Sequence, residues 1–170
     1  MTAASPDALR RVGWPLPVAL LLLAAWLGAA LYFAAVVTRA GFVTLPTRAL
    51  AGALVSHILP PLLDAGIVAG LWLAAAALRT PHGRVRSWSL AGGLGIVALC
   101  GVARFAILAR IERLRLSMPA TMEALPPGDP LRHAFGQLHA LSVGALGLAM
   151  LIGLAVAIVL LHSFAVLVHD

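Results

Sequence analysis

Two side chains of opposite charge lie inside apolar segments of this sequence. Asp64 occurs in the apolar run 62–78, and Arg104 occurs in the run 88–108. Both runs are long enough to cross the hydrocarbon of a bilayer, where a charge is costly and usually pairs or marks a functional site. An aspartate–arginine pair in this setting could lock two helices together, gate a pathway or bind a polar substrate.

Counting along the chain places the two charges at the same depth. Asp64 lies 15 residues before Arg79, where its apolar run ends, and Arg104 lies 16 residues after Trp88, where the next run begins. A short loop joins these two ends, so the two helices must be antiparallel neighbours. We therefore expect Asp64 and Arg104 to pair across them.

A histidine from the last apolar segment belongs at a similar depth. Arg104 lies 8 residues before Glu112, and His139 lies 8 residues after Leu131, at the opposite membrane face. At about 1.5 Å per residue, both lie roughly 12 Å from that face. We predict an intramembrane polar cluster with the members Asp64, Arg104, His139, Ser142 and His57.

The histidines leave a cofactor alternative open. His57 and His139 could bind haem or copper, because imidazole is a common metal ligand and bundles build such sites from facing helices. Each ring could equally satisfy a backbone carbonyl. The chain has no zinc-binding spacing, phosphate-binding loop or serine-hydrolase motif, and nothing identifies it as an enzyme. A single cysteine, Cys100, excludes an internal disulfide.

The composition is that of a membrane protein. Hydrophobic residues make up 62% of the chain and charged residues 11%, whereas a soluble domain is typically about 25% charged. The basic residues are all arginine, and those other than Arg104 lie at the ends of apolar runs, where they anchor to headgroups. The expected partner is therefore the lipid bilayer and not nucleic acid, with a homo-oligomer as an open alternative.

The hydrophobic pattern predicts an all-α fold, a polytopic membrane bundle of four transmembrane helices. A polar tail at 1–13 precedes one transmembrane domain at 14–168. Pro60-Pro61 should break the second helix or separate a short helix at 49–59 from it, because proline removes backbone donors. The four helices are expected at about 14–38, 49–79, 88–112 and 131–162.

Two glycines and the arginine distribution bear on packing and orientation. Gly66 and Gly70 form a G-x-x-x-G pair, which allows close helix contact either within the bundle or between two copies. The face with both termini holds five arginines and the other face six, so the positive-inside rule does not decide the orientation. We expect a multi-pass protein of the cell (inner) membrane.

Several short motifs resemble a known family. In the first half they are Trp26-Leu27-Gly28-Ala29, Tyr32-Phe33-Ala34, Gly41-Phe42, Leu45-Pro46 and Ala51-Gly52-Ala53-Leu54-Val55. In the second half, Asp129-Pro130 is followed by Phe135-Gly136-Gln137-Leu138-His139-Ala140-Leu141-Ser142. This pattern resembles the transmembrane protein 205-like family, also catalogued as domain of unknown function 4149. The resemblance implies a four-helix integral membrane fold without an established reaction, and a distant likeness to copper-resistance D and HemJ-type membrane proteins.

Three functions are compatible with these residues. The favoured hypothesis is a transport, gating or accessory role linked to metal or drug tolerance, because charges and a broken helix at membrane depth often mark binding sites. A structural or assembly subunit, whose polar pair only orders the bundle, ranks second. A haem- or copper-binding redox protein that uses His57 and His139 ranks third.

Overall fold

The computed structural model describes residues 15–81, 83–117, 125–126 and 128–169. These residues form helices and no strand, so the predicted all-α class is confirmed. The predicted tail at 1–13 lies outside the described residues. In chain order the helices are α2 (Pro15–Tyr32), the π-helix η1 (Phe33–Val37), α3 (Thr38–Thr44), α4 (Arg48–Leu78), α5 (Arg84–Gly101), the π-helix η2 (Val102–Ile107), α6 (Leu108–Ser117) and α7 (Pro130–His169).

These helices make four rods that are long and apolar enough to cross a membrane. The rods are Pro15–Thr44, Arg48–Leu78, Arg84–Ser117 and Pro130–Val166, with lengths of 30, 31, 34 and 37 residues. At about 1.5 Å per residue each exceeds the roughly 30 Å of hydrocarbon in a bilayer. The chain is thus a multi-pass membrane protein by the length and composition of its helices, as predicted.

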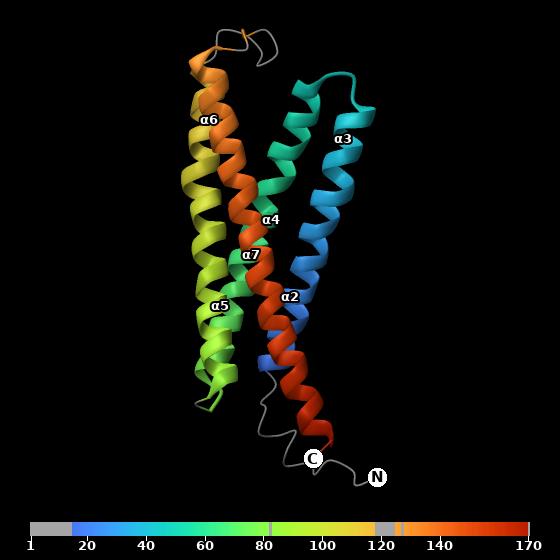
Figure 1. Cartoon of the computed structure of the whole chain (residues 1–170), viewed down its shortest axis with the longest axis vertical. Coiled ribbons are helices and arrows are strands. Elements are labelled where there is room, and N and C mark those ends of the chain that lie inside the picture. Colours follow the sequence, from blue (N-terminus) through green and yellow to red (C-terminus); the bar gives the residue numbers. More distant parts are fainter. Residues whose placement is uncertain (1–14, 82, 118–124, 127, 170) are drawn as a thin grey trace.

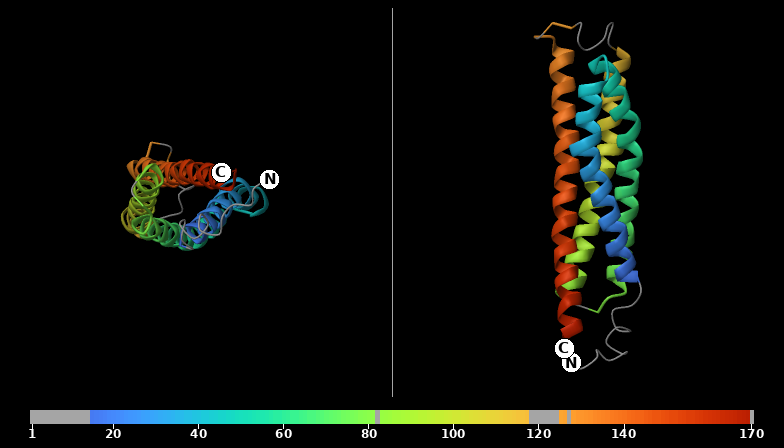
Figure 2. Two further views of the ribbon diagram at one scale, coloured as in Figure 1. Left: turned by 90° about the horizontal axis from the view of Figure 1, so that it is seen from below. Right: turned by 90° about the vertical axis from the view of Figure 1, so that its right-hand side faces the viewer.

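The four rods run up and down around a ring. The start of α2 and the end of α7 lie at one end of the bundle, and the last turns of α3 and α6 and the first turns of α4 and α7 lie at the opposite end (Figure 1). Around the ring α2 packs on α4, α4 on α5, α5 on α7, and α7 returns to α2 (Figure 2). Helix α4, which carries Asp64, and the rod that carries Arg104 are therefore direct neighbours. Helix α7 lies across the ring from α4.

The predicted break at Pro60-Pro61 is not confirmed. Helix α4 is continuous from Arg48 to Leu78 and contains both prolines. The prolines still remove two backbone N–H groups, so the carbonyls of Ser56 and His57 receive no helical hydrogen bond from them. Membrane helices tolerate proline because neighbouring helices and nearby side chains can bond to the backbone groups that it leaves unpaired.

The other helix boundaries differ from the prediction by a few residues. The first rod ends at Thr44, later than the predicted end at residue 38. The third rod begins at Arg84, earlier than the predicted start at residue 88. Gly83 precedes α5 with φ of 155° and ψ of −176°, a backbone conformation that is essentially restricted to glycine. The third rod continues without interruption through η2 and α6 to Ser117.

Glycines bring α4 and α5 into backbone contact. A Cβ atom added at Gly70 would lie 2.7 Å from the carbonyl oxygen of Gly93, and one added at Gly93 would lie 2.7 Å from the carbonyl oxygen of Gly70. A Cβ at Gly66 would lie 2.8 Å from the Cys100 sulfur and from the Trp26 ring. The G-x-x-x-G pair therefore serves packing inside the chain.

Trp26 connects the first and second rods. Its side chain is buried, and its Nε1–H donates a 3.0 Å hydrogen bond to the carbonyl oxygen of Leu62. The core around it lies in the half of the bundle nearer the termini, while no residue of α6 is buried. The end formed by α3, α4, α6 and α7 is thus the loosely packed end.

Candidate functional site

Asp64 and Arg104 form an ion pair across the α4–α5 boundary. The Nε–H of Arg104 donates to Oδ1 of Asp64 at 3.0 Å. Asp64 is contributed by α4 and Arg104 by the π-helix η2, which continues α5. The pairing expected from equal depth is present in the structure.

The pair lies near the middle of its two rods. Asp64 is 16 residues from Arg48 and 14 from Leu78, which corresponds to about 24 and 21 Å from the two ends of α4. Arg104 is 20 residues from Arg84 and 13 from Ser117, or about 30 and 20 Å from the ends of its rod. A bilayer centred on the rods therefore places both charges deep within hydrocarbon.

Asp64 belongs to the outward-facing stripe of α4. It lies four, seven and fourteen residues before Val68, Leu71 and Leu78, a spacing that keeps all four on one helix face. Those apolar side chains are 59%, 51% and 60% exposed, and the Asp64 side chain is 49% exposed. The carboxylate is thus on the surface that faces lipid.

Arg104 extends along the same outer surface. Its guanidinium carbon lies 5.4 Å from the ring centroid of Phe105, and that ring is 67% exposed. The stacking is a cation–π contact, which stabilises a cation where water is scarce. Both residues belong to the π-helical segment η2, and such segments are frequent at functional sites.

The interior behind the pair is filled with apolar side chains. Leu63 precedes Asp64 and Ala103 precedes Arg104, and both are fully buried. Cys100, one turn earlier, is 1% exposed and contacts α4 next to Gly66. The charges therefore do not line a path through the centre of the bundle at their depth.

The ion pair uses only part of its hydrogen-bonding capacity. The single contact joins one guanidinium nitrogen to one carboxylate oxygen. Within the residues that the structure describes, no group bonds to the second oxygen of Asp64 or to the terminal nitrogens of Arg104. An arginine carries five N–H donors and a carboxylate about four acceptor sites, so most of them stay available for another polar group.

The histidines lie apart from the pair. The Nδ1 atom of His57 lies 2.9 Å from the carbonyl oxygen of Ala53 in its own helix. The ring of His139 stacks on Phe135, one turn earlier in α7, with ring centroids 6.3 Å apart. Both histidines are exposed, and no contact with Asp64 or Arg104 is present among the described residues.

The predicted cluster is therefore reduced to its two charges. Ser142 is buried at 4% exposure within α7, on the rod that does not adjoin α4. In the described part of the chain, no group of three histidine, cysteine, aspartate or glutamate side chains is placed to hold a metal ion. The expected pairing of His57 with His139 at haem or copper gains no support from their positions.

Sequence reasoning did not identify Phe105 as part of the site. In a regular α-helix, residues at i and i+1 do not face each other, so the residue after Arg104 is not an expected partner. The cation–π contact lies within a local π-helix, for which the sequence carries no clear signal. The adjacency of an aromatic ring and an intramembrane arginine was the only available hint.

A comparison with protein families identifies a matching family. The model of the family described as "Domain of unknown function (DUF4149)" matches residues 21–120, which include Asp64, Arg104 and most of the first three rods. The match confirms the predicted resemblance to domain of unknown function 4149. The likeness to transmembrane protein 205, copper-resistance D and HemJ-type proteins stays a prediction. No curated protein and no solved structure matches the chain.

Proposed function

Since this chain belongs to the family described as domain of unknown function (DUF4149), we propose its function from the geometry of its own site. The chain is a membrane assembly protein that docks a second copy of itself through the Asp64–Arg104 pair. The observation that carries this proposal is a half-exposed, singly bonded ion pair on the lipid-facing surface at mid-depth. In this proposal the assembly forms in the cell (inner) membrane.

The two charges are costly at this depth in the membrane. An aspartate or arginine at the centre of a membrane helix costs about 2.5–3.5 kcal/mol on insertion scales. One hydrogen bond between them offsets only part of that cost, because unmet donors and acceptors in a low-dielectric medium are expensive. A polar surface that bonds the remaining oxygen of Asp64 and the free nitrogens of Arg104 would lower the free energy of both.

A second copy of this chain supplies such a surface. The pair presents a donor and an acceptor side by side, so a two-fold rotation brings Arg104 to the partner's Asp64. Two-fold interfaces are self-complementary and are the commonest in homo-oligomers. The four charges of such a contact sum to zero, and the exposed side chains of Phe105, Val68 and Leu71 surround them with apolar contact area.

The transport and redox hypotheses gain less support. A transport or gating role, including metal or drug tolerance, calls for charges along a route through the protein, and the interior behind this pair is filled. A redox role calls for ligands that converge, and His57 and His139 instead contact groups of their own helices. An assembly role requires only an exposed pair with hydrogen-bonding groups left over, which is the arrangement present here.

Thiol cross-linking tests the proposal in membranes. In a Cys100→Ala background, which removes the one native thiol, Val68→Cys places a thiol one turn from Asp64. Leu31→Cys is the matched control, because Leu31 is 60% exposed against 59% for Val68 and lies on α2, which does not adjoin α5. A short bifunctional maleimide should give dimers at Val68→Cys and not at Leu31→Cys.

The same experiment identifies the contribution of the charges. Adding Asp64→Leu and Arg104→Leu to the Val68→Cys chain should abolish the cross-linked dimer. Equal cross-linking at both thiol positions, or a dimer that persists without the charges, would contradict the proposal. A cross-link to a different protein in native membranes, without dimers of this chain, would assign the docking surface to another partner.

A further inference from the structure

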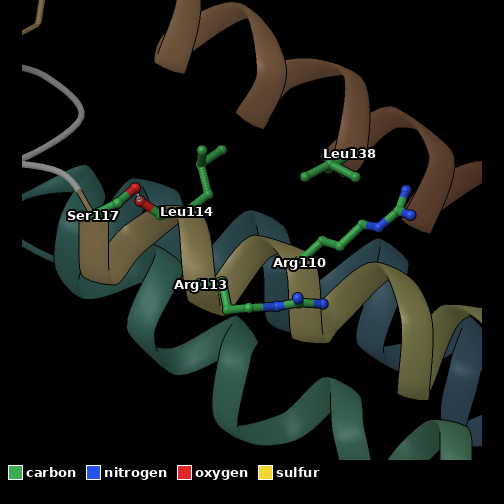
Figure 3. A pocket seen from close by; sticks show the side chains of 5 residues that line it. All are labelled: Arg110, Arg113, Leu114, Ser117 and Leu138. Carbon is green, nitrogen blue, oxygen red and sulfur yellow. Dashed lines mark hydrogen bonds between the residues drawn. The ribbon is translucent and has the colours of Figure 1, made fainter.

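A second polar feature lies toward the loosely packed end of the bundle, and its nearest arginine, Arg110, is six residues or about 9 Å along the third rod from Arg104. A groove of about 340 Å³ separates α6 from the first turns of α7. Figure 3 shows two arginines of α6 extending along it, with a leucine from α7 on the other side. Its lining residues are Arg110, Arg113, Leu114, Ser117 and Leu138.

The groove offers cationic donors that no described carboxylate neutralises. Arg110 and Arg113 are three residues apart and share one face of α6. Nε–H of Arg113 donates to the carbonyl oxygen of Ala109 at 3.2 Å, which leaves its terminal nitrogens available. No carboxylate pairs with either arginine in the part of the chain that is described, and Glu112 lies two positions from Arg110, on another face.

The hydroxyl group in the groove is already committed. Ser117 donates to the carbonyl oxygen of Leu114 at 2.8 Å. The free donors are therefore the two guanidinium groups, whose planar geometry suits bidentate bonding to phosphate oxygens. The leucine side chains give the rest of the groove an apolar wall.

The depth of the groove matches the phosphate level of a bilayer. The third rod has 34 residues, or about 51 Å, so a hydrocarbon core of roughly 30 Å leaves about 10 Å at each end. Arg110 lies 7 residues from Ser117, at about that distance from the end of the rod. Leu138 lies 8 residues after Pro130, about 12 Å from the start of α7 and on the hydrocarbon side of the boundary.

We propose that this groove binds the headgroup phosphate of an anionic phospholipid. Arg110 and Arg113 hold the phosphate, and an acyl chain lies against Leu114 and Leu138. Two arginines without a carboxylate partner among the described residues favour a lipid with net negative charge, because none of the lining residues is a carboxylate that could bind the ammonium group of a zwitterionic headgroup. The site is separate from the proposed dimer contact and does not depend on it.

The test measures lipid selectivity directly. The protein is reconstituted in phosphatidylcholine bilayers at physiological salt with spin-labelled phosphatidylglycerol or spin-labelled phosphatidylcholine, and the motionally restricted fraction is recorded. Wild type should prefer phosphatidylglycerol. The double variant Arg110→Gln, Arg113→Gln should remove the preference. Each arginine lost should lower the association constant for phosphatidylglycerol about fivefold.

A matched variant separates the groove from the general charge of this membrane face. Arg39→Gln with Arg48→Gln removes the same charge from exposed positions at the same end of the bundle, on α3 and α4. This variant should keep the preference. An equal loss in both double variants would overturn the proposal in favour of diffuse surface potential.

A second variant keeps all charges and fills the groove. Leu138→Trp should displace the restricted lipid while leaving the net charge unchanged, so it tests the site even where the arginine variants fold poorly. A preference that survives Leu138→Trp would also overturn the proposal. Millimolar inorganic phosphate should not displace the labelled lipid, and displacement would show that the groove takes a free anion instead.

Discussion

Replacing the two intramembrane charges separately and together gives the sharpest test of their physical state. Asp64→Leu leaves Arg104 unpaired near mid-membrane, and a guanidinium cannot lose its proton. Removing one partner of a buried pair typically costs about 3–5 kcal/mol, and inserting a lone charge costs about 2.5–3.5 kcal/mol. We therefore expect Asp64→Leu to lower the free energy of unfolding by about 3 kcal/mol.

Arg104→Leu should cost less, because a carboxyl group left alone can be neutralised by a proton. The double variant should unfold within about 1 kcal/mol of wild type or above it, since replacing both members of a pair with apolar groups is often neutral or stabilising. The two single effects therefore should not add.

The assay is unfolding by SDS titration in dilute mixed micelles, where the protein is monomeric, followed by tryptophan fluorescence. Leu71→Ala, on the same exposed stripe of α4, is the matched control and should shift the midpoint little, because a lipid-facing residue loses few protein contacts. Additive effects of the two charge replacements would refute the account, since additivity means that the charges do not interact.

Three further predictions follow from the packing and the histidines. Gly70→Ala should destabilise the bundle by about 1–3 kcal/mol because the new methyl group meets the backbone of α5, whereas Gly101→Ala, with no atom within 4 Å of the new Cβ, should be neutral in the same titration. Trp26→Phe should cost about 1 kcal/mol through loss of the indole hydrogen bond to α4, and equal midpoints for wild type and variant would contradict this. His57→Ala together with His139→Ala should leave the visible spectrum and metal content of the purified protein unchanged, because each ring contacts its own helix; a haem or copper signal lost in this variant would restore the redox hypothesis.

Residue counting predicted the depth of the charges but not the direction in which they face. Asp64 and Arg104 pair as expected because antiparallel helices joined by a short loop match depth with residue number. The same counting grouped His139 with them, and it failed because depth does not determine which face of a helix a residue occupies. The exposed stripe of α4 becomes visible only once the neighbours of that helix are known.

The local backbone was the least predictable part. Pro60-Pro61 suggested a break because two hydrogen-bond donors are lost, and α4 nevertheless runs through them where tertiary contacts hold the helix. The π-helical segments η1 and η2 have no recognisable sequence signature, yet Arg104 and Phe105, which form the cation–π contact, both lie in η2. The glycine pair at Gly66 and Gly70 was recognised, and the structure assigns it to internal packing.

If the exposed ion pair joins two copies of the chain within the bilayer, removing both charges must change the number of copies per assembly. Fluorescently labelled wild type and the Asp64→Leu, Arg104→Leu double variant are reconstituted at low density in liposomes, and photobleaching steps per vesicle are counted over a range of protein-to-lipid ratios. Wild type should shift from one step to two as the ratio rises, while the double variant should stay at one step. Identical step distributions for the two proteins would contradict it, because a pair that serves only the single bundle has no effect on association.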